Sequence, residues 1–237
     1  MAASGHARGE PDDRSRTRFY DELVVGAVED GVGQVVLLAA GMDTRAFRLP
    51  LAPGAVVFGL DQAELLEEKR RVLDQHHSEP RCRRIAVAAD LAEDTWPQAL
   101  SAAGFDATAA GVFIAEGLSW YLTEAENARL LDNVALVASV GSRLGIDMVS
   151  RDFLENPAVV PFFELTAARG IRWQFGTNEP AGFLATHGWL AEVTDFDVVA
   201  RRLGRWPPPG VAEDLAAHAA AASHSYFIRA ERAAPET

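Results

Sequence analysis

The chain has 237 residues, of which 49% are hydrophobic and 24% charged, a balance typical of a globular protein long enough to bury its own core. Asp and Glu outnumber Lys and Arg by 34 to 22, and the net charge of −12 argues against nucleic acid or an anionic membrane as a partner, because both require a basic face. The single cysteine, Cys82, excludes an intramolecular disulfide and a cysteine-based metal site, and we expect no bound metal.

The amino-terminal stretch is polar and lacks the apolar centre of a secretory signal. We expect residues 1–14 to form a flexible tail and residues 15–237 to form one domain. No apolar run approaches the roughly 20 residues needed to span a bilayer. We therefore expect a cytoplasmic protein without membrane contact.

The first 150 residues alternate between two kinds of pattern. Apolar residues at helical spacing predict a helix over 15–29, and further helical stretches follow near 62–77, 96–103 and 123–138. Apolar runs predict strands at 34–39, 55–60, 84–88, 110–115 and 143–149. This alternation predicts an α/β, doubly wound and mostly parallel sheet, whose ligands bind at the carboxyl ends of the strands.

The pattern changes after residue 150. Residues 151–178 are too irregular for another strand–helix unit, and we expect them to form an inserted cap over the sheet. Helices are predicted at 180–187 and 212–222, and strands at 189–196 and 225–230. These two strands bring the predicted sheet to seven, and we expect it to end in 225–230 as an antiparallel strand.

Three successive predicted strands end in residues suited to a nucleoside. Gly41 lets the chain turn sharply and lets a ligand approach the backbone. Asp61 ends the second strand, where a carboxylate accepts both hydroxyls of a ribose. Asp90 ends the third, where it can accept from the amine of adenine while the amide of Leu91 meets a ring nitrogen. A single such Asp is often only a helix cap, but three successive strand ends that each carry a suitable residue favour an adenosine pocket.

This pocket lacks the features that bind phosphate. A dinucleotide fold carries three spaced glycines, whereas the corresponding positions here are Ala39, Gly41 and Thr44. A nicotinamide-dependent reductase is therefore disfavoured. S-adenosylmethionine, which joins adenosine to a zwitterionic amino acid without phosphate, fits this pattern as the cofactor.

Four blocks of sequence make a resemblance specific. The runs VVLLAAGMDTRAFRL, DQAELLEEK, AADL and IAEGLSWYL resemble the leucine carboxyl methyltransferase-like family of S-adenosylmethionine-dependent O-methyltransferases. The similarity extends from 15–21 to 175–189. It implies a class I methyltransferase fold, which is Rossmann-like. It also implies a small-molecule acceptor, which in bacterial members of the family is of polyketide type.

The resemblance also implies roles for individual residues. Arg16, with Arg18 as its rival, is expected to pair with the cofactor carboxylate, and Glu116 is expected near its amino group. The remaining cofactor-binding candidates are Ala39, Gly41, Asp61, Gln62, Asp90 and Leu91. The chain departs from the family pattern at Ala39, where glycine is usual, and the extra methyl lies close to the expected path of the cofactor.

The acceptor is less well defined. A carboxylate is ionised at neutral pH and needs no catalytic base, whereas a hydroxyl does. The candidates for such a base are Tyr121 and His187. Each also has a purely structural interpretation: Tyr121 as a core aromatic residue, and His187 as a residue at the end of a helix. The absence of a clear base favours a carboxylate acceptor. Trp120, Phe162, Phe163 and Trp173 are either an apolar acceptor pocket or packed core. The alternative function is a cofactor-binding homologue without methyl transfer.

Overall fold

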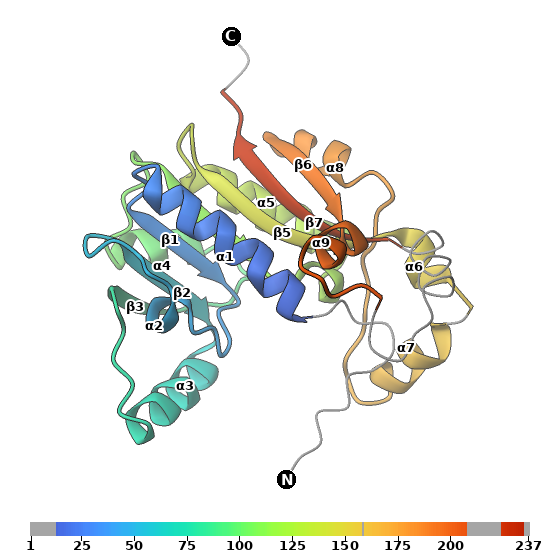
Figure 1. Ribbon diagram of the computed structural model, residues 1–237, viewed down its shortest axis with the longest axis horizontal. Helices are drawn as coiled ribbons and strands as arrows, with labels where there is room; N and C mark the ends of the chain where they lie inside the picture. The colour runs from blue at the N-terminus through green and yellow to red at the C-terminus, as the bar shows by residue number, and fades with distance from the viewer. Residues whose placement is uncertain (1–12, 158, 208–223, 235–237) are drawn as a thin grey trace.

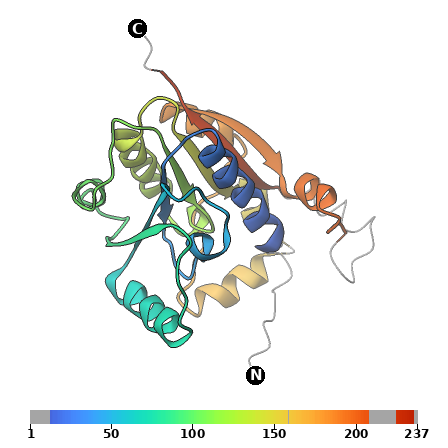
Figure 2. The same ribbon diagram turned by 60° about the vertical axis from the view of Figure 1, so that its left-hand side comes forward.

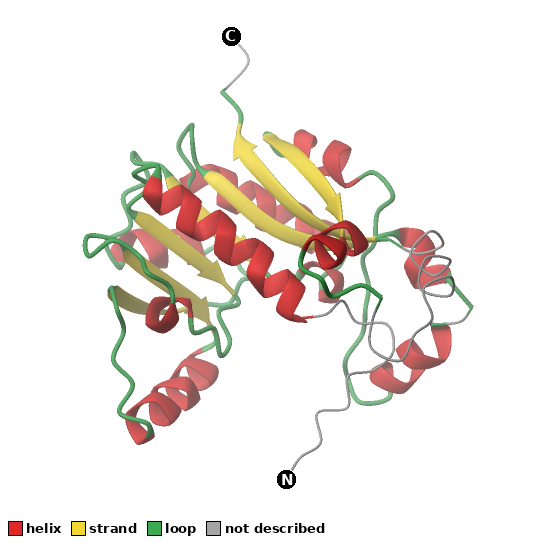
Figure 3. Cartoon of the chain, in the orientation of Figure 1, coloured by secondary structure: helices red, strands yellow, loops and turns green. Residues whose placement is uncertain are grey.

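The protein, represented by a computed structural model, is an α/β structure in which the described residues form one sheet covered by helices (Figures 1 and 3). The structure describes residues 13–157, 159–207 and 224–234. Within these ranges seven strands lie side by side in the order β3-β2-β1-β4-β5-β7-β6. The mostly parallel, doubly wound sheet expected from the sequence is confirmed.

The parallel strands are apolar because both of their faces are covered. Val35 and Val36 point to opposite faces of β1, and both are completely buried. The strands are β1 (Gln34–Leu38), β2 (Val56–Asp61), β3 (Arg83–Ala88), β4 (Gly111–Ala115), β5 (Arg143–Val149), β6 (Trp189–Asp195) and β7 (Ser225–Arg232). Strands β1 to β5 pair in parallel, so their carboxyl ends meet at one edge.

Helices cover the two faces of the sheet and build two separate cores. The helices are α1 (Asp13–Glu29), α2 (Arg45–Arg48), α3 (Ala63–Gln75), α4 (Trp96–Ala102), α5 (Glu124–Val137), α6 (Arg151–Glu155), α7 (Val160–Ala167), α8 (Pro180–Thr186) and α9 (Phe196–Arg202). Helix α1 crosses in front of the sheet in Figure 1 and shares a core with α2 and α9. Helices α4, α5 and α8 pack on the opposite face. The predicted cap of α5 is confirmed, because Thr123 and Glu126 form a reciprocal capping box.

Three expectations about the chain's elements need correction or stand untested. Strand β7 is antiparallel, as expected, but it pairs with both β5 and β6, so β6 and not 225–230 forms the edge of the sheet. Helices α2 and α9 were not predicted: the four residues of α2 are too short to show a helical period, and α9 begins directly where β6 ends. The helix predicted at 212–222 and most of the tail 1–14 lie outside the described residues.

The segment after β5 contains α6 and α7, which pack separately from the two main cores. Phe153 of α6 is buried with Trp120 and Val149, and Phe163 and Trp173 pack against them. Trp120 belongs to a 3-10 helix, η1 (Ser119–Tyr121), which follows β4. Figure 2 shows α7, in gold, on the lower side of the molecule, the side on which α1 begins. None of the helices that the structure describes is both long enough and apolar enough to cross a membrane.

Candidate functional site

The loop after β1 forms one wall of a pocket at the carboxyl ends of the parallel strands. The amide of Gly41 donates to Asp61 Oδ2 at 2.7 Å, and the amide of Ala40 donates to the carbonyl of Leu60 at 2.8 Å. These bonds hold the end of β1 against the end of β2. Beside the loop lies a pocket of about 330 Å³, which α1 and the end of β4 close on the other side.

Two residues of this loop have left-handed backbone conformations. Gly41 has φ +40°, which glycine adopts without a steric penalty. Ala39 has φ +54°, and a residue with a Cβ is strained there by about 1–2 kcal/mol. The backbone therefore gives a physical reason for the glycine expected at position 39. Both residues line the pocket.

The ends of β2 and β3 follow next along the same edge of the sheet. Asp61 Oδ1 accepts from the amide of Gln62 at 2.8 Å, so backbone donors orient both carboxylate oxygens. The amide of Ala89 donates to the carbonyl of Asp61 at 2.9 Å, which ties the end of β3 to this position. Asp90 is exposed, and its carboxylate accepts from the amide of Ala92 at 2.9 Å, while Leu91 is half-buried. Asp90 thus orders its own turn, and Gln62 points into solvent.

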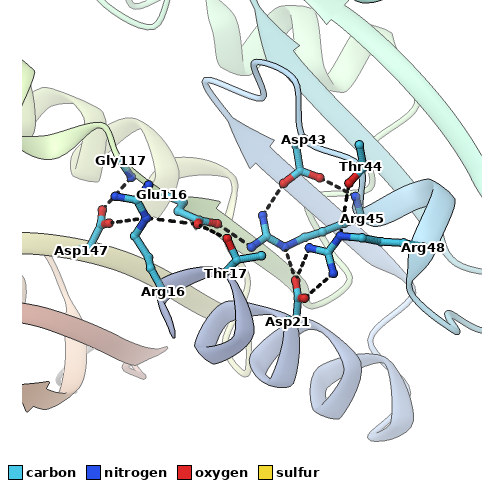
Figure 4. Close-up of polar contacts among 10 residues, drawn as sticks. All are labelled: Arg16, Thr17, Asp21, Asp43, Thr44, Arg45, Arg48, Glu116, Gly117 and Asp147. Carbon is cyan, nitrogen blue, oxygen red and sulfur yellow. Dashed lines mark hydrogen bonds and ion pairs between the residues drawn. The ribbon is translucent and has the colours of Figure 1, made fainter. Parts of the chain in front are cut away.

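Glu116 and Arg16 meet on the opposite wall of the pocket (Figure 4). Glu116 follows β4, and its Oε1 accepts from Arg16 Nε at 3.2 Å and from the hydroxyl of Thr17 at 3.2 Å. Its Oε2 accepts from Arg45 Nη2 at 2.5 Å. The two arginines thus hold one carboxylate between α1 and α2. The sequence-derived pair Arg16 and Glu116 is brought together although 100 positions separate the two residues.

Arg45 is an almost completely buried charge of the site. Its side chain is 2% exposed, and Nε donates to Asp21 Oδ1 at 2.9 Å while Nη1 pairs with Asp43. Arg48, one turn later on α2, donates through Nη2 to the same Asp21 at 2.7 Å but is 37% exposed. Asp21 belongs to α1, so this ion-pair network fastens α1 to the carboxyl ends of β1 and β4 (Figure 4).

Asp147 is a carboxylate inside strand β5, with a side chain 2% exposed. Its Oδ1 accepts from the amide of Gly117 at 2.8 Å, and Oδ2 lies 3.5 Å from Arg16 Nε. Burial raises the pKa of Asp147 to about 7, Arg16 opposes this shift, and Glu116 adds to it. Asp147 therefore fixes the loop that carries Glu116 and also the arginine that pairs with Glu116.

Seven predicted site residues do not line this pocket. Asp61, Gln62, Asp90 and Leu91 lie at the ends of β2 and β3, and the other three lie elsewhere in the structure. Arg18 is 64% exposed and pairs with Glu22 on the surface of α1 at 3.0 Å. His187 ends α8, where its Nδ1 lies 2.7 Å from Asp132 Oδ1. It precedes β6, whose start lies beside the amino end of β5, at the edge of the sheet opposite to the pocket. Tyr121 is closer to the site, on η1, but its ring packs against Trp173 with centroids 6.1 Å apart.

The sequence analysis did not identify several residues of this ion-pair network. Asp147 interrupts the apolar run RLGIDMV, and a buried acid in a strand demands a partner, so a usable signal was present. Arg45 lies in a block that was noted, yet nothing local shows that its partners come from α1 and β4. Among the described residues, no group of three or more His, Cys, Asp or Glu is arranged to hold a metal ion.

Comparisons with known proteins relate the chain to one family. Residues 12–135 match the model of the leucine carboxyl methyltransferase family. A Streptomyces avermitilis protein that carries the provisional name S-adenosyl-L-methionine-dependent methyltransferase is 43% identical over 194 residues, covering 80% of this chain and 66% of the relative. The chain thus spans about two thirds of the length of such relatives.

Two solved structures share the fold at low sequence identity. A DUF574 family protein from Streptomyces avermitilis superposes with a TM-score of 0.65 at 17% identity, covering 92% of this chain and 83% of that chain. Human N-acetylserotonin methyltransferase, solved with S-adenosylmethionine, gives 0.54 at 14% identity, covering 92% and 56%. The fold, the family match and the named relatives converge, and the chain belongs to the leucine carboxyl methyltransferase family of S-adenosylmethionine-dependent methyltransferases.

Proposed function

We propose that this chain transfers the methyl group of S-adenosylmethionine to an oxygen of a small-molecule acid, and that the pocket beside Gly41 holds the amino-acid part of the cofactor. One observation carries the proposal: Arg16 and Glu116 form a paired cation and anion in the pocket wall. A zwitterionic ligand carries the complementary pair. The resemblance to bacterial members of the family supports a polyketide-type acid.

The electrostatics of the pocket suit a cation. The side chains drawn in Figure 4 include the guanidinium groups of Arg16, Arg45 and Arg48 and the carboxylates of Asp21, Asp43, Glu116 and Asp147. When all are ionised, this set carries one net negative charge. S-adenosylmethionine carries one net positive charge, from a sulfonium, an ammonium and a carboxylate. The pocket volume of about 330 Å³ also falls within the range of small-molecule sites, about 300–1,000 Å³.

In this proposal the chain binds and aligns the cofactor in three places. Arg16 contacts the carboxylate of the amino-acid part, since a guanidinium presents several donors in one plane. Glu116 contacts the ammonium, because a carboxylate has more acceptor positions than the three donors already on it occupy. Asp61, oriented by the amides of Gly41 and Gln62, accepts from the ribose hydroxyls. Asp90 and the amide of Leu91 contact the adenine.

Alignment is the main catalytic contribution that the chain makes. Bound S-adenosylmethionine supplies a methyl carbon from which sulfur departs with the bonding electron pair as an acceptor oxygen attacks in line. Holding two reactants in this geometry can account for about 7–11 kcal/mol of the barrier. The described residues that line the pocket include no His, Lys, Cys or Tyr. A carboxylate acceptor needs no such base, because it is already ionised at neutral pH.

A pair of arginines on α1 tests the cofactor site. We expect Arg16→Gln to weaken S-adenosylmethionine binding by about 10- to 100-fold, the loss of a charge-assisted hydrogen bond. Arg18→Gln should leave the dissociation constant unchanged, since Arg18 pairs with Glu22 away from the pocket. Isothermal titration calorimetry measures both constants, and Arg16→Lys, which keeps the charge, controls for folding. Equal affinities for the two Gln variants would remove Arg16 from the site.

A second function, cofactor binding without methyl transfer, is favoured by the strained Ala39 in the pocket lining. The two functions differ only in turnover. Transfer of a labelled methyl group from S-adenosylmethionine to a panel of carboxylic acids and matched alcohols distinguishes them. Esters formed from the acids alone support our proposal, ethers from the alcohols contradict the carboxylate assignment, and tight cofactor binding with no product supports the second function.

A further inference from the structure

Helix α7 has an apolar sequence that the fold leaves largely uncovered. Its residues read VPFFELTA, and none of these eight described residues is fully buried. Leu165 of this helix is 54% exposed, and Ile171, which follows the helix, is 47% exposed. Tyr121 of η1 is 37% exposed. Apolar side chains gathered on a surface in this way mark a binding site more often than chance exposure does.

Three aromatic rings form the centre of this surface, and we call them the cap patch: Tyr121, Phe162 and Trp173. The ring of Trp173 lies 6.1 Å from that of Tyr121 and 6.3 Å from that of Phe162, both in edge-to-face geometry. All three residues keep part of their surface in solvent. Trp120, for which the sequence left open an acceptor pocket or packed core, is 3% exposed and packs in the core with Val149 and Phe153.

A continuous column of side chains joins the cap patch to the pocket. Trp173 stacks on Trp120 with centroids 4.9 Å apart and ring planes 17° from parallel. The guanidinium of Arg16 lies over the other ring of this pair, 5.7 Å from the centroid of Trp120. Arg16 also lines the pocket. A single ring, that of Trp120, therefore separates the cap patch from Arg16, the residue that we assign to the cofactor carboxylate.

Backbone contacts fix the cap patch in this position. Gln174 donates from its amide to the carbonyl of Trp120 at 2.6 Å and from Nε2 to the carbonyl of Tyr121 at 2.7 Å. The 3-10 helix that carries Trp120 and Tyr121 begins three residues after Glu116. In both views of the ribbon α7 lies on the same lower side of the molecule as the amino-terminal end of α1 (Figures 1 and 2). The patch thus borders the cofactor site rather than a remote surface.

We propose that the cap patch binds a flat aromatic ring system of the acceptor, so that the substrate class is a ring-bearing carboxylic acid. This inference rests on the proposed function. Exposed aromatic rings favour ring partners, because offset stacking and edge-to-face contacts add to the burial of apolar area. The reaction sets the orientation: the patch is uncharged, and the acid end of the acceptor must lie in the adjoining pocket to meet the methyl group. Arginines and carboxylates together line that pocket.

Two model acids of similar size but different shape test the inference. With S-adenosylhomocysteine present, we expect 2-naphthoate to bind at least about 10-fold more tightly than cyclohexanecarboxylate, as measured by calorimetry. Tyr121→Ala should weaken 2-naphthoate about 3- to 10-fold, the worth of one aromatic contact, and Tyr121→Phe should restore it. Leu136→Ala removes an apolar side chain that is 71% exposed on α5 and should change nothing. The affinity for S-adenosylhomocysteine should stay constant throughout.

The outcomes separate this inference from the proposed function. The ring site is overturned if saturated and aromatic acids are methylated with equal kcat/KM and Tyr121→Ala does not change either value. That result leaves the proposed methyl transfer standing. Binding of 2-naphthoate that depends on Tyr121 without any methyl transfer supports the ring site and contradicts the proposed reaction. A dimer in sedimentation velocity that Tyr121→Ala or Ile171→Ser dissociates would show that a second copy covers the patch, and would also overturn the inference.

Discussion

Asp147 shows how one residue can link the stability of the fold to the site. Its ordinary pKa is 3.8, and burial raises the pKa to about 7 in the folded protein. The folded chain therefore holds this proton more tightly than the unfolded chain does. Ionisation of Asp147 costs stability as the pH rises from about 4 to about 7, and the cost is complete above that window. At neutral pH the fold thus carries an unfavourable charge, which positions Arg16 and Gly117.

We expect Asp147→Asn to remove this pH dependence while keeping an oxygen that accepts from Gly117. Relative to the wild type, the free energy of unfolding of the variant should rise by on the order of 2–3 kcal/mol between pH 5 and pH 8. Urea denaturation at the two pH values measures it. Asp106→Asn is the control, because hydrogen bonds from Thr108 lower the pKa of Asp106 and keep it ionised at both pH values. A constant difference between Asp147→Asn and wild type would contradict the account.

At the scale of single elements, α2 has only four residues and yet it holds α1 to the sheet. Arg45 and Arg48 both bond Asp21, but their side chains are 2% and 37% exposed. Removing one partner of a buried ion pair leaves its acids uncompensated, whereas a half-exposed pair is screened by water. The two arginines therefore form a matched pair for measuring what burial does to the same kind of contact.

We expect Arg45→Met to lower the free energy of unfolding by about 3–5 kcal/mol, because Asp21, Asp43 and Glu116 lose a shared cation. Arg48→Met should cost about 1 kcal/mol or less. Urea denaturation at neutral pH gives both values, and the mean residue ellipticity confirms that each variant is folded. If the two substitutions cost the same, burial of Arg45 is not the reason for its stabilising effect.

The regular elements were predictable because their signals are local. Val35 and Val36 stand in an apolar run bounded by a turn, and Thr123 with Glu126 marks a helix start within four residues. Strand order at the edge of the sheet is not local: β7 comes last in the chain yet inserts between β5 and β6. Nothing in residues 225–230 alone distinguishes an edge strand from its neighbour, so the expected edge was wrong.

The site was predictable only in part, for the same reason. Gly41 and Asp61 follow buried strands, and their proximity follows from the parallel sheet that places such ends together. The contacts of Arg45 with Asp21 and of Asp147 with Gly117 join positions 24 and 30 residues apart through packing that no spacing rule encodes. His187 was chosen for its chemistry, and the register of β6 and β7 puts it at the other end of the sheet.

At the scale of the whole molecule, the net charge of −12 acts differently on each reactant. A negative protein attracts a cation and repels an anion over distances of about one Debye length, roughly 10 Å at 0.1 M salt. In the proposed reaction the cofactor enters with one positive charge, the product cofactor leaves with none, and the acceptor enters with one negative charge. We therefore expect ionic strength to change the association of the cofactor, the product cofactor and the acceptor in three different ways.

We expect the association rate constant of S-adenosylmethionine to fall about 2- to 5-fold as the salt concentration rises from about 20 to 200 mM, because salt screens the attraction. S-adenosylhomocysteine, which differs from the cofactor by the loss of the methyl group and its charge, should associate at a rate nearly independent of salt. Stopped-flow tryptophan fluorescence follows both reactions. With saturating cofactor, kcat/KM for an anionic acceptor should rise over the same range as its repulsion is screened. Parallel salt responses of the two cofactor forms would mean that attraction by the net charge of the chain does not govern entry.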